Sequence, residues 1–290
     1  DAQGDITAAH AQAGGNLLIN TLADATLTGS AQADGNLTLL ASSLNMADDS
    51  RFSAGGTLAL TTVGDMHLGL LENTGTAATQ FLIRAGGFVL GNGDGQVNLS
   101  GSHAGIAEIE AGLGIGSETT ALLVDLPQLT SVEALSGDIY LQHRNDLSIG
   151  SLLAQDGHVV LGNNGGLLSA GTLDAYQSFD FTGGSLTATE IWARNDDMFV
   201  DASGAVDIGS LDAAGDLELL LDGELVLTRA EVGGDALLQH RGAAGTALQY
   251  GSLIIGGDLT VDGAGDWQGT EATVENDVVF DVGSADLGSV

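Results

Sequence analysis

The stretch VDIGSLDAAGD, Val206–Asp216, decides the fold because the chain contains close copies of it. The same apolar and small residues return at the same offsets in LSIGSLLAQDG, Leu147–Gly157, and in LQYGSLIIGGD, Leu248–Asp258. ADLGSV, Ala285–Val290, begins a further copy. Self-similarity of this kind predicts a repeat architecture in which each copy packs against the next one.

A shorter block gives the period of the repeat. It consists of a small residue, a polar residue and then apolar-x-apolar, and its copies begin at Gly15, Gly35, Gly56, Gly95, Gly137, Gly157, Gly215, Gly234, Gly257 and Asn276. Successive copies mostly start 18 to 23 residues apart, or about twice that where one copy is degraded. The period is therefore about twenty residues.

Within each period apolar and polar residues alternate, which is the pattern of a β-strand. A pair such as Leu217 and Leu219 is followed by a second pair, then by a small corner and a short third segment. No segment carries the 3.6-residue apolar spacing of a helix over ten residues. The side chains predicted to point inward include Leu147, Ile149, Leu152, Val206, Ile208, Leu211, Leu217, Leu219, Leu259 and Val261.

These patterns predict an all-β chain that forms a parallel β-helix solenoid, with about 20 residues and three short strands per coil. Residues 1–290 are expected to form a single rod of about fourteen coils, on the order of 70 Å long at about 4.8 Å per coil, and irregular at 100–136. Glycines at the corners are expected to provide positive φ and close backbone approach. Pro127 is expected at a corner, since it cannot donate a ladder hydrogen bond.

Composition limits the partners that the chain can bind. The formal net charge is −33, from 39 acidic and 6 basic residues, and 43% of the residues are hydrophobic, so the chain has the apolar content to fold. The acid excess argues against binding to nucleic acid or to an anionic membrane. No apolar run is long enough for a spanning helix, so membrane insertion is not expected. There is no cysteine, and hence neither a disulfide nor a thiolate metal site.

The repeats GDLELLLDGELVLTRAEVGGD and GDIYLQHRNDLSIGSLLAQDG resemble the coils of filamentous haemagglutinin-type bacterial exoproteins. The resemblance covers most of the chain. It implies a right-handed parallel β-helix that is secreted or displayed on the bacterial cell surface and acts in adhesion or aggregation. The chain begins and stops inside a repeat, which predicts that it is a fragment of a longer repeat protein. The secretion module of such exoproteins is not evident in this sequence.

A column of acidic residues is the first candidate site. The slot after the turn glycine holds Asp138, His158, Asp216, Asp235, Asp258 and Asp277, with Asn16, Asn36 and Thr57 earlier in the chain. Stacked coils would place these side chains about 5 Å apart. One interpretation is a Ca²⁺-binding ladder through Asp216, Asp235, Asp258 and Asp277. The favoured interpretation is that each side chain bonds its own backbone to close its turn, with no cofactor. GNGDGQVNL at Gly91 is likewise interpreted as an ordinary turn.

The second candidate is LQHR, which occurs at Leu141–Arg144 and again at Leu238–Arg241. His143 with Arg144, and His240 with Arg241, could bind an anionic group. The favoured interpretation is an internal duplication on an exposed strand end. Acidic pairs such as Asp196 and Asp197 with Asp201 are expected by chance in so acidic a chain.

These observations predict no catalytic residues and a non-catalytic rod that acts in adhesion, aggregation or the assembly of a filament or matrix. Its expected partners are copies of itself stacked end to end, and a cell-surface glycan or a protein receptor. The alternatives are a carbohydrate- or partner-binding module and a polysaccharide-degrading β-helix enzyme. The absence of lysine weighs against a lyase.

Overall fold

The computed structural model confirms an all-β parallel solenoid of about 14 turns, with roughly 20 residues per turn. The structure describes residues 2–75, 80–93, 95–103 and 105–286, with the side chains of 283–285 excepted. No helix occurs among these residues. The last four residues of ADLGSV, and Asp94 of the motif at Gly91, lie outside the described residues. The chain divides into two compact units, Asp1–Gly150 and Ser151–Val290, which are described separately below as units 1 and 2.

The strands of unit 1 are short, and most span three to six residues. They are β1 (Ile6–Ala13), β2 (Leu17–Asn20), β3 (Ala25–Ala33), β4 (Leu37–Ala41), β5 (Leu44–Met46), β6 (Arg51–Ala54), β7 (Thr57–Thr62), β8 (Met66–Leu68), β9 (Leu70–Asn73), β10 (Gln80–Ala85), β11 (Phe88–Gly91), β12 (Leu99–Gly101), β13 (Ile106–Ala111), β14 (Gly114–Ile115), β15 (Leu122–Asp125), β16 (Gln128–Ala134) and β17 (Ile139–His143). Strand β18 (Leu147–Ala154) spans the boundary between the units.

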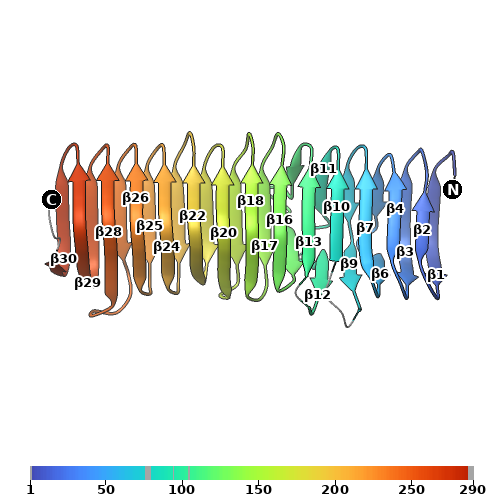
Figure 1. The fold of residues 1–290 in the computed structure, drawn as a ribbon, viewed down its shortest axis with the longest axis horizontal. Helices are drawn as coiled ribbons and strands as arrows, with labels where there is room; N and C mark the ends of the chain where they lie inside the picture. Colours follow the sequence, from blue (N-terminus) through green and yellow to red (C-terminus); the bar gives the residue numbers. More distant parts are fainter. Residues whose placement is uncertain (1, 76–79, 94, 104, 287–290) are drawn as a thin grey trace. The chain divides into compact units, whose positions relative to one another are not determined.

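The strands of unit 2 alternate between five residues and eight or nine for most of its length. They are β19 (Val159–Asn163), β20 (Leu167–Ala175), β21 (Phe179–Gly183), β22 (Ser185–Ala193), β23 (Met198–Ala202), β24 (Val206–Ala213), β25 (Leu217–Leu221), β26 (Leu225–Val232), β27 (Ala236–His240), β28 (Ala247–Ile255), β29 (Leu259–Val274) and β30 (Val278–Asp286). Figure 1 shows the strands of each unit stacked side by side.

Strands pair in parallel with their equivalents one coil later, as the twenty-residue period predicts. In unit 2, Phe179 of β21 pairs with Met198 of β23, which pairs with Leu217 of β25. Paired residues lie as few as 18 positions apart, at Leu167 and Ser185. In unit 1 the separation reaches 28 positions, where Leu71 of β9 pairs with Leu99 of β12. The coils therefore tolerate insertions at their turns while they keep their register.

Unit 2 corrects the expected number of strands per coil. The second and third predicted segments form one continuous strand, such as β24. Its buried residues are Val206 and Ile208, then Leu211 and Ala213, so the alternation changes phase at Gly209–Ser210. Each coil has three apolar faces, as expected. Two of these faces belong to one strand that continues around the bend between them.

The bend explains the small residues in the repeated stretch. A Cβ atom on Gly209 would lie 2.7 Å from the carbonyl oxygen of Thr189 in the preceding coil, closer than real Cβ contacts. A Cβ atom on Gly150 would lie 2.5 Å from the carbonyl oxygen of Thr130. Glycine is needed here because the neighbouring coil is close, and neither residue has positive φ.

All ten residues predicted to face inward are buried, none of them more than 2% exposed. They form the core with larger side chains that include Phe179 and Phe181. Pro127 lies at the bend between β15 and β16, as predicted. At about 25 cal/mol for each Å² of buried apolar area, this core is the main stabilising contribution to each coil.

The short blocks that define the period do not all occupy one column of strands, which corrects the simple repeat series. Within unit 1, the blocks at Gly35 and Gly56 form β4 and β7, whose column continues through β10, β13 and β16. The block at Gly137 forms β17, which pairs instead with β14 and β15. Each coil contains two turns that need a small residue, so the same short block arises at either turn.

Residues 100–136, expected to be irregular, include the regular strands β13 and β16 as well as very short ones. Strand β14 has only two residues, and the buried Asn98 side chain bridges coils by donating to the carbonyl oxygen of Leu68 and accepting from the backbone N–H of Leu123. A buried amide whose nitrogen and oxygen are both hydrogen-bonded in this way joins coils where a regular strand ladder is absent.

Candidate functional site

The acidic column of unit 2 is a hydrogen-bonded ladder between coils. The backbone N–H of Asp216 donates to Oδ1 of Asp197 at 2.8 Å, and that of Asp235 donates to Oδ1 of Asp216 at 2.8 Å. The N–H of Asp258 donates to Oδ1 of Asp235 at 2.8 Å, and that of Asp277 to Oδ1 of Asp258 at 3.0 Å. Each carboxylate thus accepts a hydrogen bond from the same position in the next coil.

This geometry corrects the expectation that each side chain closes its own turn. Equivalent residues in a parallel stack lie about 4.8 Å apart, so an Asp side chain reaches the N–H of the next coil. The other turn of the coil, before β2, β4 and β7 of unit 1, has the same kind of bond: Oδ1 of Asn16 accepts from the N–H of Asn36, and Oδ1 of Asn36 accepts from the N–H of Thr57, both at 2.9 Å. The ladder needs a short side chain with an oxygen acceptor, and a charge is optional.

The ladder also explains the glycine that precedes most of its residues. A Cβ atom on Gly234 would collide with Oδ1 of Asp216, and one on Gly257 would collide with Oδ1 of Asp235. Neither glycine has positive φ, so the expectation of a left-handed conformation at these turns was wrong. The glycine is therefore required by its contact with the aspartate of the preceding coil, although in the sequence it is seen only beside the aspartate of its own coil.

A groove of about 750 Å³ runs beside the ladder of unit 2. Its lining includes acidic side chains from several strands and turns, namely Asp180, Asp196, Asp197, Asp216, Glu218, Asp235 and Asp258. Burial raises the pKa of Asp180 above its usual value; His158 opposes that shift, and the charges of Asp196 and Asp197 reinforce it. The groove is lined by acidic residues, and the raised pKa of Asp180 lets it keep a proton more easily than an ordinary aspartate does. Sequence reasoning missed Asp180, because it lies outside the repeated slot.

The calcium candidates Asp216, Asp235 and Asp258 lie in this groove, and Asp277 continues the ladder beyond it. Among the described residues, no three His, Asp or Glu side chains are grouped so as to hold a metal ion. One oxygen of Asp216, Asp235 and Asp258 already accepts a backbone N–H. Calcium binding at this column stays the alternative to the prediction of no cofactor, and the N–H bonds account for the acidic residues without it.

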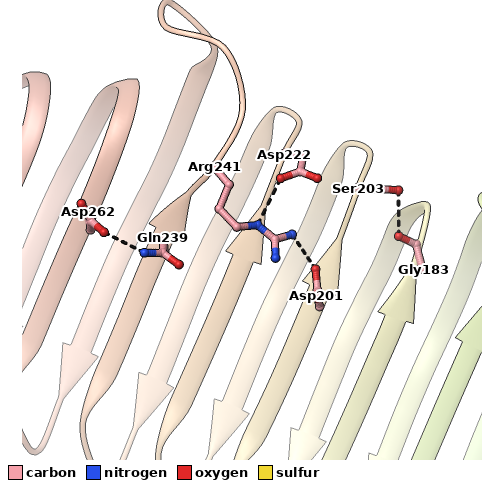
Figure 2. A network of polar contacts seen from close by, with 7 residues as sticks. All are labelled: Gly183, Asp201, Ser203, Asp222, Gln239, Arg241 and Asp262. Carbon is pink, nitrogen blue, oxygen red and sulfur yellow. Dashed lines mark hydrogen bonds and ion pairs between the residues drawn. The ribbon is translucent and has the colours of Figure 1, made fainter.

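The opposite edge of the short strands in unit 2 carries a polar network (Figure 2). Arg241 donates from its terminal nitrogen to Oδ1 of Asp201 at 2.5 Å and from Nε to Oδ1 of Asp222 at 3.1 Å. Ser203 donates to the carbonyl oxygen of Gly183, and Gln239 donates to Asp262 at 2.7 Å. A hollow of about 600 Å³ lies beside Arg241, lined also by Asn163, Asn164, Thr182, Ser203 and other residues of the same turns.

The burial of the two LQHR copies bears on both interpretations of them. His143 and His240 are each only 2% exposed, so they are core residues and cannot bind an anion at the surface. Arg241 is ion-paired, and Arg144 donates to the carbonyl oxygen of Gly95 at 2.7 Å. The strand-end interpretation holds for the arginines, whereas the histidines end the apolar inner face of β17 and β27.

His143 is held by its Nδ1, which lies 2.6 Å from the carbonyl oxygen of Asn145. Burial lowers its pKa below the usual value, against the smaller opposing influences of that hydrogen bond and of Asp146. A buried imidazole that resists protonation adds an acid-sensitive position to unit 1.

The structure separates the acidic residues Asp196 and Asp197 from Asp201. The first two lie in the turn before β23 and line the acidic groove, whereas Asp201 is near the other end of that strand and binds Arg241. The remaining arginines are also engaged: Arg51 with Glu72, Arg84 with Glu108 and Glu110, Arg194 with Asp174, and Arg229 with Glu231. All six guanidinium groups therefore have partners, which leaves little cationic surface for a polyanion.

No protein-family model, curated protein or solved structure matches this chain. Among the described residues, no helix has the length and apolar character needed to cross a lipid bilayer.

Proposed function

We propose that the chain is a non-catalytic structural segment whose stacked coils hold or project other parts of a larger protein. The observation that carries this proposal is the ladder itself. The most regularly repeated polar residues, such as Asp216 and Asp235, use their acceptor oxygens to bond adjacent coils. Repetition of a polar residue in a solenoid is therefore accounted for by stacking, without a reaction.

The wider setting of this segment is a bacterial exoprotein of the filamentous haemagglutinin type, secreted or displayed on the cell surface and active in adhesion, aggregation or filament assembly. The resemblance of the coil sequences supports this setting, as does a surface with a formal charge of −33 that keeps a long β-protein in solution.

The proposal is tested on the native protein with an antibody raised against this chain. We expect an immunoblot of whole cells and culture medium to detect a band far larger than the 29.1 kDa of this chain, and intact cells to be labelled. A band near 29.1 kDa confined to permeabilised cells would contradict the proposal.

Catalysis is tested separately, with a panel of neutral and acidic polysaccharides incubated with the purified chain. We expect no release of reducing ends or unsaturated products. Turnover that is lost in Asp180→Asn would contradict the non-catalytic proposal, because the raised pKa of Asp180 suits a general acid.

A second candidate function is carbohydrate binding at the hollow beside Arg241. The lining of amide, hydroxyl and guanidinium groups favours it, since these groups form directional hydrogen bonds with sugar hydroxyls. A glycan array probed with the wild-type chain and with Asn164→Ala tests this candidate. Binding that the substitution abolishes would favour the module, and the absence of binding on the array would reject it.

A further inference from the structure

One edge of unit 1 exposes apolar side chains in successive coils. The edge is formed by the turns that lead into β3, β5, β8, β11, β14 and β17. Its exposed apolar residues are Leu22, Val63, Leu113 and Leu135. Leu40, near the end of β4, and Phe88, at the start of β11, flank these turns, and we call the six residues the apolar turn stripe. Leu22 is 78% exposed and Val63 is 81% exposed, while the other four are between 39% and 42% exposed.

Backbone hydrogen bonds show that these turns stack on one another. The N–H of Gly64 donates to the carbonyl oxygen of Ser42, and the N–H of Gly87 donates to that of Gly64. The N–H of Leu113 then donates to the carbonyl oxygen of Gly87. The turns after β4, β7, β10 and β13 accordingly lie side by side along the upper edge of unit 1 in Figure 1. One apolar side chain per coil extends the stripe over about 24 Å, at about 4.8 Å per step.

The matching turns of unit 2 show that the fold does not require apolar residues there. Leu22 and Val63 stand two residues before the ladder residues Asp24 and Asp65. In unit 2 the residues two positions before the ladder are Asp156, Tyr176, Asn195, Ala214, Gly233, Gly256 and Glu275. Apart from Tyr176 these are polar or small, and their coils have the same parallel register. Leu22 and Val63 are therefore apolar at a position where the fold does not require an apolar residue.

The surroundings of the stripe are acidic. Asp24 and Asp65 are exposed and line a groove of about 680 Å³ that Val63 also lines. On the neighbouring strand face Arg84 is paired with Glu108 and Glu110, at 3.8 and 3.5 Å. An apolar stripe with carboxylates beside it complements a ligand whose apolar face is bordered by cations. It does not complement another copy of this chain, which carries the same negative charge.

We propose that the apolar turn stripe binds an amphipathic basic helix of a partner protein. An α-helix presents apolar residues every three or four positions, with a pitch of about 5.4 Å that approximates the coil spacing of about 4.8 Å. A helix of about 16 residues spans the stripe. Its apolar face covers Leu22, Val63 and Leu113, and its lysines or arginines lie against Asp24 and Asp65. This interface does not depend on the scaffold function proposed above.

The test uses a synthetic peptide of leucine and lysine, with leucine at helical spacing and a fluorescent label, titrated with the full chain. A peptide of the same composition, scrambled so that leucine surrounds the helix, serves as the ligand control. The variant Leu22→Ser/Val63→Ser/Leu113→Ser removes the apolar contacts. The matched protein control is Tyr176→Ser/Val226→Ser, which removes two exposed apolar residues from unit 2. Thermal unfolding followed by circular dichroism checks that both variants fold.

We expect the wild-type chain to bind the amphipathic peptide and the triple variant to bind it at least about tenfold more weakly. The unit 2 control should bind like the wild type, and the scrambled peptide should bind weakly to every protein. Added salt should weaken binding of the amphipathic peptide without abolishing it, because only the carboxylate contacts are screened.

Equal binding of the amphipathic and scrambled peptides, or equal binding by the triple variant and the wild type, would overturn the proposal. Sedimentation velocity provides a second criterion. Dimers of the wild type that the triple variant loses would assign the stripe to self-association instead. Flotation of the wild type, but not of the triple variant, with phosphatidylcholine vesicles would assign it to a lipid surface and would also overturn the proposal.

Discussion

The ladder edges of the two units solve the same stacking problem with different chemistry. Unit 2 uses a run of aspartates from Asp197 to Asp277. In unit 1, Asp65 makes the same bond at the matching turn before β8, whereas Asn16 and Asn36 make it at the other turn of the coil, before β2 and β4. The required elements are a short acceptor side chain and, usually, a preceding glycine without a Cβ atom. The charge of the acceptor side chain and the identity of the exposed residue two positions before it differ from coil to coil. Both can therefore serve solubility or binding.

The largest effect is expected from a charge placed in the shared core. Leu217→Asp buries a carboxylate between the strands that pair with β25, and we expect a loss of several kcal/mol that spreads to β23 and β27. Hydrogen exchange read by mass spectrometry should show the loss of protection decreasing with distance from β25. Leu220→Asp is the matched control, since Leu220 faces outward on the same strand and is only partly buried. Protection lost equally in both units would contradict nearest-neighbour stacking.

Gly234→Ala tests the contact behind the Gly-Asp pair. The added methyl group would collide with Oδ1 of Asp216, and we expect destabilisation of about 1–3 kcal/mol, measured as a lower Tm. Gly15→Ala in unit 1 is the control, because a Cβ atom there has no neighbour within 4 Å. Adding Asp216→Ala to Gly234→Ala should restore part of the loss. Equal Tm values for Gly234→Ala and Gly15→Ala would show that the contact is not limiting.

His143 should give unit 1 an acid sensitivity. Burial lowers its pKa in the folded state below the usual 6.5, so the unfolded chain takes up the proton more readily. Stability is therefore complete above pH 6.5 and falls as the pH drops below it. We expect the difference in Tm between about pH 7.5 and about pH 5.5, one unit above and one unit below the usual pKa, to be smaller in His143→Gln than in the wild type.

Asp180 contributes in the opposite direction, because its raised pKa makes the folded state bind the proton more readily as the pH falls. Asp180→Asn should therefore enlarge the acid sensitivity and serves as the control for His143→Gln. If the Tm of His143→Gln changed with pH as much as that of the wild type, His143 would not be the source of the acid sensitivity.

A smaller effect is expected from the charge of the ladder. Asp216→Ala removes the acceptor for the N–H of Asp235 and should cost about 0.5–1 kcal/mol at this exposed position. Asp216→Asn keeps an acceptor, as Asn36 does in unit 1, and should stay within about 0.5 kcal/mol of the wild type. Salt should raise the Tm of the wild type more than that of Asp216→Asn, by screening repulsion along the ladder. Equal Tm values for the Ala and Asn variants would contradict the hydrogen-bond account.

The smallest effect is expected from a chelator. Because the N–H bonds account for the aspartates of unit 2, EGTA should leave the Tm of the protein unchanged. A marked fall in Tm that Ca²⁺ reverses would indicate a metal bound by the folded state. Loss of that response in Asp216→Asn/Asp235→Asn would then place the metal at the ladder of unit 2.

The sequence by itself determined the parallel solenoid, the period and the inward residues. A coil cannot bury its apolar face alone, so pairs such as Val206 and Ile208 must recur in register, and this recurrence is visible in the linear chain. The small corner at Gly209–Ser210 was visible for the same reason. The strand continuity through that corner was not, because it depends on hydrogen bonds to the coils on either side.

Only the tertiary structure decided which atoms meet between coils. The N–H of Asp235 bonds to Asp216, which stands 19 positions earlier in the chain. The burial of His143 and His240 and the raised pKa of Asp180 depend on packing against neighbouring coils. Likewise Leu22 and Val63 are ordinary apolar residues in the sequence, and stacking alone places them on one exposed edge. Residue types at inward positions repeat because the shared core constrains them. The role of an outward residue depends on the residues that neighbouring coils place beside it.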